Sequence, residues 1–159
     1  MSSPASIAGH PIHPMLITIP IGLWVFSLVA DIIRMTGLGG PVWEDIALYT
    51  MIGGLVGALA AAIPGMIDFV SIGEHRTKQI GLAHMLINLG VVGLYIVNTY
   101  LRATGVAEEL GLYAMSAVAV VALAISGWLG GELVFKHGVA VEPQHESPEQ
   151  ERAKIRRAA

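Results

Sequence analysis

Four long apolar blocks dominate the pattern of hydrophobic and polar positions along the chain. Each block is close to the ~20 residues that a helix needs to cross ~30 Å of hydrocarbon. The blocks cover residues 15–33, 46–70, 80–101 and 112–135. We therefore predict an all-α integral membrane protein with a four-helix bundle over residues 1–141 and a polar C-terminal tail over residues 142–159.

The composition supports a membrane location for these blocks. Of the 159 residues, 54% are hydrophobic and 13% are charged, whereas charged residues make up about 25% of a soluble domain. The first block exceeds the ~7–15 apolar residues of a signal peptide and follows no basic segment, so it should remain as an anchor. The tail contains Pro143 and Pro148, and its composition favours disorder or a short surface helix.

Polar and small residues mark one face of each predicted helix. The stripes at helical spacing are Pro20, Trp24, Ser27 and Asp31 in the first block, and His84, Asn88, Tyr95 and Asn98 in the third. We expect both stripes to face the bundle interior. Small residues predict close helix contacts in the other two blocks: Gly53, Gly57, Ala60 and Pro64, followed by Asp68, in the second, and Gly127 and Gly131 in the fourth.

Weak internal similarity raises the alternative that the bundle is a duplicated hairpin. At an offset of 71, His13 and Gly22-Leu23-Trp24-Val25 align with His84 and Gly93-Leu94-Tyr95-Ile96. At an offset of 62, a second set of residues relates the second block to the fourth: Ala60, Ala62, Ile63, Gly65 and His75 align with Ala122, Ala124, Ile125, Gly127 and His137. A duplication predicts a pseudo-two-fold axis along the membrane normal, whereas chance matches in apolar sequence predict none.

The ionisable residues of interest collect at one end of the predicted bundle. An even number of crossings places both termini and the loop over residues 71–79 on the same side. That end gathers His10, His13, Asp68, Glu74, His75, His84, Glu132 and His137. A single interfacial histidine is usually just solvated, but charged groups inside hydrocarbon cost ~2.5 kcal/mol or more and normally have a partner. The cluster therefore predicts a binding site.

The segment Gly9-His10-Pro11-Ile12-His13-Pro14 precedes the first block. Pro14 suits a first helical turn because no N–H is needed there. Each proline biases the histidine before it toward an extended conformation. We therefore expect stiff backbone to present both imidazoles at the helix entrance.

These features, with Asp31, Asp68, His84 and the closing run from Gly130 to Val139 (GGELVFKHGV), resemble a bacterial membrane family called domain of unknown function 2231. The resemblance covers roughly residues 8–141. In size and helix count the family is similar to small b-type cytochromes, and some relatives are joined to Rieske-type iron–sulfur domains, which implies a redox setting. This chain has no cysteine and cannot hold a Rieske cluster itself.

A b-type haem between two histidines is the first functional hypothesis. A glycine-lined bundle can admit a porphyrin, and bis-histidine ligation suits electron transfer because iron keeps no open position. His84 is the expected ligand, with His13 or His137 as its partner and His10 as a further candidate. Arg76 or Lys78 would meet the propionates at the interface.

A non-haem zinc, iron or copper site is the alternative. Its ligands would come from His10, His13, His84 and His137, with Asp68 or Glu132 as a carboxylate ligand or orienting group. A cofactor-free scaffold or partner subunit is the third hypothesis, in which Asp31 pairs with Arg34 or Arg102 at the opposite end.

Charge and motifs limit the remaining alternatives. The net charge of −3 does not indicate nucleic-acid binding, and the sequence contains no Walker loop, nucleophile elbow or His-Glu-x-x-His motif, so independent catalytic activity is not indicated. Seven Lys and Arg residues fall on the side of the termini and two on the other, which favours cytoplasmic termini. We expect a multi-pass protein of the bacterial inner membrane, with lipid as its main partner and a redox protein or a second copy as further partners.

Overall fold

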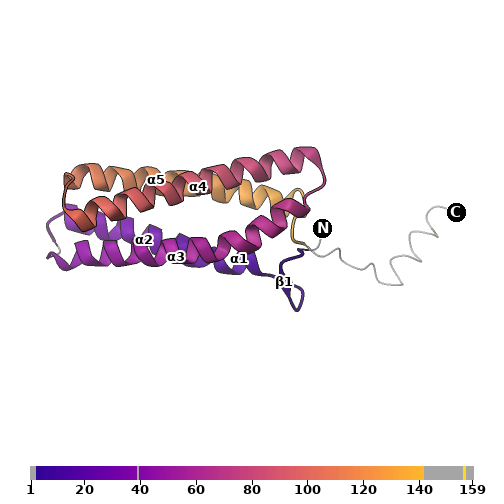
Figure 1. Cartoon of the computed structure of the whole chain (residues 1–159), viewed down its shortest axis with the longest axis horizontal. Coiled ribbons are helices and arrows are strands. Elements are labelled where there is room, and N and C mark those ends of the chain that lie inside the picture. Colours follow the sequence, from indigo (N-terminus) through magenta and orange to yellow (C-terminus); the bar gives the residue numbers. More distant parts are fainter. Residues whose placement is uncertain (1–2, 39, 142–155, 157–159) are drawn as a thin grey trace.

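The computed structural model describes residues 3–38, 40–141 and 156, and within these residues the chain is mostly helical. The elements follow one another as β1 (Ser6–Ile7), β2 (His10–Pro11), α1 (Ile12–Leu16), α2 (Thr18–Met35), α3 (Val42–Ser71), α4 (His75–Thr104) and α5 (Glu109–Phe135) (Figure 1). Four stretches are long and apolar enough to cross a membrane, the first of which combines α1 and α2. The predicted four-helix fold is confirmed. The prediction for the tail over residues 142–159 concerns residues that, apart from Arg156, lie outside the described part.

A tight hairpin precedes the first span. β1 and β2 pair antiparallel, with Ile7 opposite His10, and the two residues between them, Ala8 and Gly9, have φ of 50° and 78°. A two-residue turn in which both residues have positive φ matches the right-handed twist of the two strands that it connects. Between α1 and α2 the helix is interrupted only at Ile17, whose N–H donates to the His13 carbonyl, so α1 and α2 continue one another.

The helices extend beyond the apolar blocks that predict them. α3 and α4 have 30 residues each. The first turn of α3 contains Glu44 and Asp45, which favour a helix N-terminus, and α4 ends at Gly105 in the left-handed conformation, a common helix stop. Apolar blocks therefore locate the hydrocarbon-spanning part of a helix, while capping residues set its ends.

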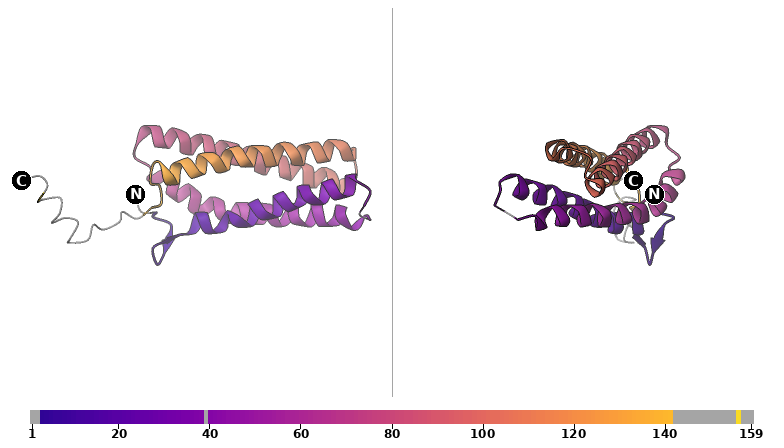
Figure 2. Two further views of the ribbon diagram at one scale, coloured as in Figure 1. Left: turned by 180° about the vertical axis from the view of Figure 1, so that it is seen from behind. Right: turned by 60° about the vertical axis from the view of Figure 1, so that its left-hand side comes forward.

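The bundle consists of two antiparallel hairpins. α2 packs along α3, α4 packs along α5, and the two hairpins meet where α3 contacts α4 and α2 contacts α5 (Figures 1 and 2). The short hairpin of β1 and β2 and the end of α5 lie at the same end of the bundle (Figure 1), as an even number of crossings requires.

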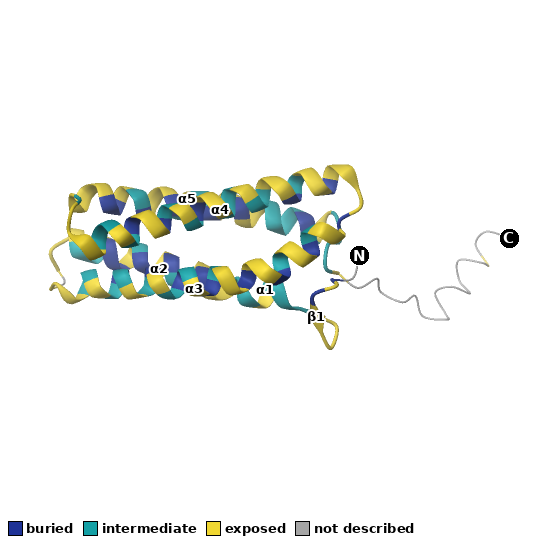
Figure 3. Cartoon of the chain, viewed as in Figure 1, coloured by how far each residue is buried: buried dark blue, intermediate teal, exposed yellow. Residues whose placement is uncertain are grey.

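Figure 3 shows buried positions between the helices and exposed positions around the outside. The predicted stripes on the first and third blocks face inward: Pro20, Trp24, Ser27, Asp31, Tyr95 and Asn98 are buried, and His84 and Asn88 are half-buried. The outside carries large exposed apolar side chains on every long helix, including Ile32, Val56, Ile96 and Val121. Soluble proteins rarely expose so much contiguous apolar surface, so this surface is suited to hydrocarbon.

Two predictions about small residues are wrong. On α3, Ala60 is exposed and Ala61 is the buried residue. On α5, a Cβ added at Gly127 or Gly131 would meet nothing within 4 Å, so neither glycine makes a close helix contact within the chain. Periodicity identifies the face of a helix only approximately, and an error of one residue corresponds to a rotation of about 100°. Such an error is enough to exchange a buried position for an exposed one.

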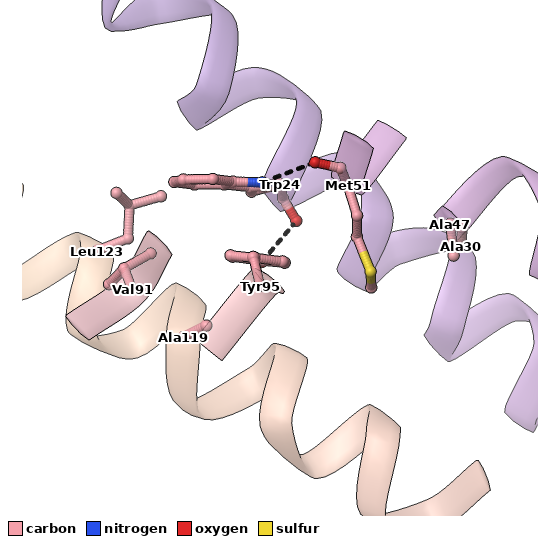
Figure 4. Close-up of a cluster of buried hydrophobic side chains, with 8 residues drawn as sticks. All are labelled: Trp24, Ala30, Ala47, Met51, Val91, Tyr95, Ala119 and Leu123. Carbon is pink, nitrogen blue, oxygen red and sulfur yellow. Dashed lines mark hydrogen bonds between the residues drawn. The ribbon is translucent and has the colours of Figure 1, made fainter. Parts of the chain in front are cut away.

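The hydrophobic core contains residues of both hairpins, including Trp24, Met51 and Tyr95 (Figure 4). The rings of Trp24 and Tyr95 stack with centroids 4.4 Å apart and an interplanar angle of 7°. The indole N–H of Trp24 donates to the Met51 carbonyl at 3.3 Å, and the Tyr95 hydroxyl donates to the Trp24 carbonyl at 3.3 Å. One aromatic pair thus links α2, α3 and α4.

Candidate cofactor site

His13 is fixed to α3 by its ring. Its Nδ1 lies 2.8 Å from the carbonyl oxygen of Ala61. Because a carbonyl only accepts, Nδ1 carries the proton, and the lone pair of the neutral ring is on Nε2. A Cβ added at Gly65 would lie 2.7 Å from this Nδ1, so glycine is what admits the ring.

The prediction of extended backbone holds for His10, which lies in β2, and is wrong for His13, which lies inside α1. The bias that Pro14 exerts on the residue before it is weak compared with a hydrogen bond to α3 and a continuing helix. Pro14 itself lies in the first turn of α1, as predicted.

His84 makes the corresponding contact within the second hairpin. Its Nδ1 lies 2.8 Å from the carbonyl oxygen of Ser126 on α5, and the Ser126 hydroxyl is 3.0 Å from the same nitrogen. A Cβ added at Gly130 would lie 3.1 Å from Cε1 of the ring. The nitrogen Nε2 lies 3.1 Å from the side-chain nitrogen of Asn88, which can donate to it.

The two histidines occupy equivalent places in the two hairpins. They are 71 positions apart, the separation that also relates Trp24 to Tyr95 and Asp31 to Arg102. Their partners are 65 positions apart, both for the carbonyls of Ala61 and Ser126 and for Gly65 and Gly130. These matched contacts agree with the proposed offset of 71 for the first and third blocks. For the second and fourth blocks they replace the offset of 62 by 65.

His13 belongs to the first hairpin, in α1, and His84 to the second, in α4. Both are half-buried. An imidazole whose Nδ1–H is held by a carbonyl has a fixed ring and a basic Nε2, the arrangement typical of histidines that ligate metals. This pair can therefore present two nitrogen ligands from different hairpins.

The other candidate ligands have separate local partners. Nδ1 of exposed His10 lies 2.9 Å from the Ala8 carbonyl, Glu132 pairs with Lys136 at 3.1 Å, and Nδ1 of His137 lies 2.9 Å from the Thr77 hydroxyl. Asp68 accepts a hydrogen bond of 2.6 Å from the Ser3 hydroxyl and thereby holds the N-terminal segment. Among the residues that the structure describes, no group of three or more His, Asp or Glu side chains is arranged to hold a metal ion.

Glu74 caps α4 beside this end. Its carboxylate accepts hydrogen bonds from the backbone N–H groups of Arg76 at 2.9 Å and Thr77 at 2.6 Å. The Thr77 hydroxyl and these N–H groups stabilise the charged form and lower the pKa of Glu74 from 4.5 to about 2. Glu74 directly precedes the first residue of α4, and an acidic residue is a common cap at this position.

A polar network holds the opposite end of the bundle. Arg102 donates to Asp31 at 2.8 Å and to Asn98 at 2.9 Å, and both members of the ion pair are buried. Arg34 pairs with Glu44 and lies 3.7 Å from Glu109. Of the two partners proposed for Asp31, the structure pairs it with Arg102 across the bundle, and Arg34 has acidic partners on α3 and α5 instead.

Several participants were not foreseen from the sequence. No sequence motif distinguishes these residues from others in the apolar blocks. They are Ala61, which offers its carbonyl, Ser126, which offers its carbonyl and hydroxyl, and the glycines Gly65 and Gly130. Asn88 and His84 share a stripe at a spacing of four, and that spacing is the one signal that could have paired them.

Together, four apolar helices, an apolar outer surface and buried polar groups between the hairpins define an integral membrane four-helix bundle. More particularly, the chain belongs to the family described as predicted membrane protein (DUF2231), which matches residues 9–143. The resemblance noted in the sequence is thereby confirmed. Searches of curated proteins and of solved structures found no match.

Proposed function

We propose that this membrane protein binds one b-type haem between its two hairpins, that His13 and His84 would be the residues that hold it, and that it transfers electrons. The observation that carries the proposal is the matched geometry of the two rings: each Nδ1 is held 2.8 Å from a helix carbonyl of its own hairpin. Nε2 is then the ring nitrogen left for a cofactor, and in His84 it also lies 3.1 Å from the side-chain nitrogen of Asn88. Two histidine ligands leave iron without an open position, which suits electron transfer rather than catalysis.

His13 fits this role better than His137 does. His137 bonds to the Thr77 side chain near the helix ends, whereas His13 occupies the place in the first hairpin that His84 occupies in the second. The hydrophobic cluster around Trp24 and Tyr95 includes neither histidine, so both rings remain available to a ligand. Exposed Arg76 and Lys78 on the first turn of α4 supply positive charge for the propionates.

The test is an absorption spectrum of the protein purified in detergent from cells supplied with haem precursor and iron. A six-coordinate spectrum that sharpens on reduction with dithionite is expected for the wild type. His13→Ala and His84→Ala should each lose haem or become five-coordinate, because one axial ligand is missing. His10→Ala is the matched control and should keep the wild-type spectrum, since His10 is exposed and bonds to its own hairpin.

Elemental analysis of the same sample separates the alternatives. A colourless protein with stoichiometric zinc, copper or iron would contradict the haem proposal and favour a non-haem site. A protein with neither haem nor metal would favour a scaffold or partner subunit.

We further propose that the termini face the cytoplasm of a bacterium whose inner membrane holds the protein. The support is the excess of Lys and Arg at the end with the termini, whereas Arg34 and Arg102 at the other end are both ion-paired. Because the chain has no cysteine, single Gly73→Cys and Val106→Cys variants report each side cleanly. A membrane-impermeant maleimide should label Cys at 106 in intact cells and Cys at 73 only after lysis; the reverse pattern would invert the orientation.

A further inference from the structure

Asn88 is placed to control the ligand nitrogen of His84. It follows His84 by one turn of α4, and its side-chain nitrogen lies 3.1 Å from Nε2 of His84 and 3.0 Å from the His84 carbonyl oxygen. Both partners are acceptors, because Nδ1 of His84 already donates to Ser126. The carboxamide therefore has its NH2 group toward His84 and can give one hydrogen to each acceptor.

The first hairpin lacks this arrangement. The separation of 71 that relates His13 to His84 places Ile17 where the second hairpin has Asn88, and isoleucine has no polar side-chain group. Among the described residues, the hydrogen bond made by the His13 ring is the one from Nδ1 to Ala61. The two histidines are therefore alike at Nδ1 and different at Nε2.

We propose, resting on the haem function proposed above, that Asn88 competes with iron for Nε2 of His84. Without haem, the amide holds the lone pair that a metal would use. If haem were bound, the same lone pair would be needed to hold it, and Asn88 would keep its bond to the His84 carbonyl. His13 would then be the permanent ligand, and His84 would be the exchangeable one. Asn88 acts through His84 and is a positioning residue.

The competition predicts opposite effects for two matched variants. Asn88→Leu removes the competing donor with little change in volume, so haem should bind about fivefold more tightly, as ~1 kcal/mol for one hydrogen bond implies. Ile17→Asn places an amide one turn after His13, and haem should bind about fivefold more weakly. Haem titration followed at the Soret band measures both.

A small gaseous ligand reports the exchange directly. If carbon monoxide displaced His84 in the ferrous haem protein, Asn88 would stabilise the freed imidazole. Carbon monoxide should therefore bind about fivefold more weakly to Asn88→Leu than to the wild type. A residue that only fills space would not move haem and carbon monoxide affinities in opposite directions.

The haem-free protein provides a measurement that needs no variant. ¹⁵N spectra of histidine-labelled protein should show His84 as the neutral tautomer with the proton on Nδ1 and a hydrogen-bonded lone pair on Nε2. A proton on Nε2 would overturn the competition, because Asn88 could not donate to that nitrogen. Equal haem affinity in the wild type and Asn88→Leu would also overturn it while leaving the haem function intact. Absence of haem binding in both proteins would overturn the haem function and the competition together.

Discussion

At the scale of single residues, the Glu74 carboxylate makes the stability of one helix end depend on pH. Its pKa is lowered from 4.5 to about 2 by hydrogen bonds from Thr77 and Arg76. A group with a lowered folded-state pKa stabilises the fold above the unfolded-state value and loses that effect as the pH falls through the folded-state value. The contribution of Glu74 is therefore complete above about pH 4.5 and lost toward pH 2.

Replacement of Glu74 by Gln should flatten the acid side of the stability curve. Gln keeps an acceptor for the N-terminal N–H groups but cannot carry the charge that favours a helix N-terminus. Thermal unfolding in detergent between pH 5 and pH 2 should show a smaller drop for Glu74→Gln than for the wild type. Glu108→Gln is the control, because Glu108 precedes α5 without a side-chain capping bond; an equal change in both variants would contradict the assignment.

Gly65 sets the position of the His13 ring. A Cβ at this residue would lie 2.7 Å from Nδ1, so Gly65→Ala should displace the imidazole from the Ala61 carbonyl and destabilise the protein by about 1–3 kcal/mol. Gly127→Ala is the control, since a Cβ there meets nothing within 4 Å, and its helix propensity should leave stability equal or improved. Unfolding in detergent measures both. Equal losses would mean that the contact with His13 is not what requires glycine.

At the scale of elements, the Tyr95 side chain connects the two hairpins. Its hydroxyl donates to the Trp24 carbonyl at 3.3 Å while its ring stacks on the indole. Tyr95→Phe keeps the stack and loses the hydrogen bond, so the free energy of unfolding should fall by about 0.5–1.5 kcal/mol. Tyr100→Phe, on the exposed side of the same helix, should change it little. A similar loss in both variants would show that the hydroxyl bond to α2 carries no particular weight.

Sequence periodicity predicts the helices and their buried faces, but it does not predict which residues of the neighbouring helices those faces contact. The spacing of Trp24, Ser27 and Asp31 identifies a buried face because a helix repeats every 3.6 residues. Periodicity does not say which carbonyl a side chain meets, so it gives no sign that His13 contacts Ala61 or that His84 contacts Ser126. Periodicity likewise does not distinguish Gly130 from Gly127 and Gly131, because all three lie in the fourth apolar block and only the rotation of α5 against α4 separates them.

At the scale of the whole molecule, the side-chain contacts at the two ends of the bundle could be predicted from the sequence to different extents. The sequence leaves Arg34 and Arg102 as alternative partners for Asp31, because a charge that hydrocarbon would penalise needs a partner, and the structure pairs Asp31 with Arg102. The histidine end was predicted as a gathering of ligands, and the structure gives most of them separate local partners. A carboxylate or imidazole near water has many available partners, whereas a buried charge has few, so the buried pair was the easier inference.

The repeat relation and the ion pair together predict the result of exchanging the charges. Asp31 and Arg102 are 71 positions apart and form one bridge of 2.8 Å, so a two-fold relation between hairpins maps each residue onto the place of the other. Asp31→Asn should cost about 3–5 kcal/mol, because Arg102 is left buried and uncompensated. The double variant Asp31→Arg with Arg102→Asp should recover most of this loss.

Breaking the exposed pair by Glu132→Gln should cost at most about 1 kcal/mol. Unfolding in detergent ranks the three, and a double variant no more stable than Asp31→Asn would show that the surroundings of the pair, such as Asn98, are not interchangeable between the hairpins.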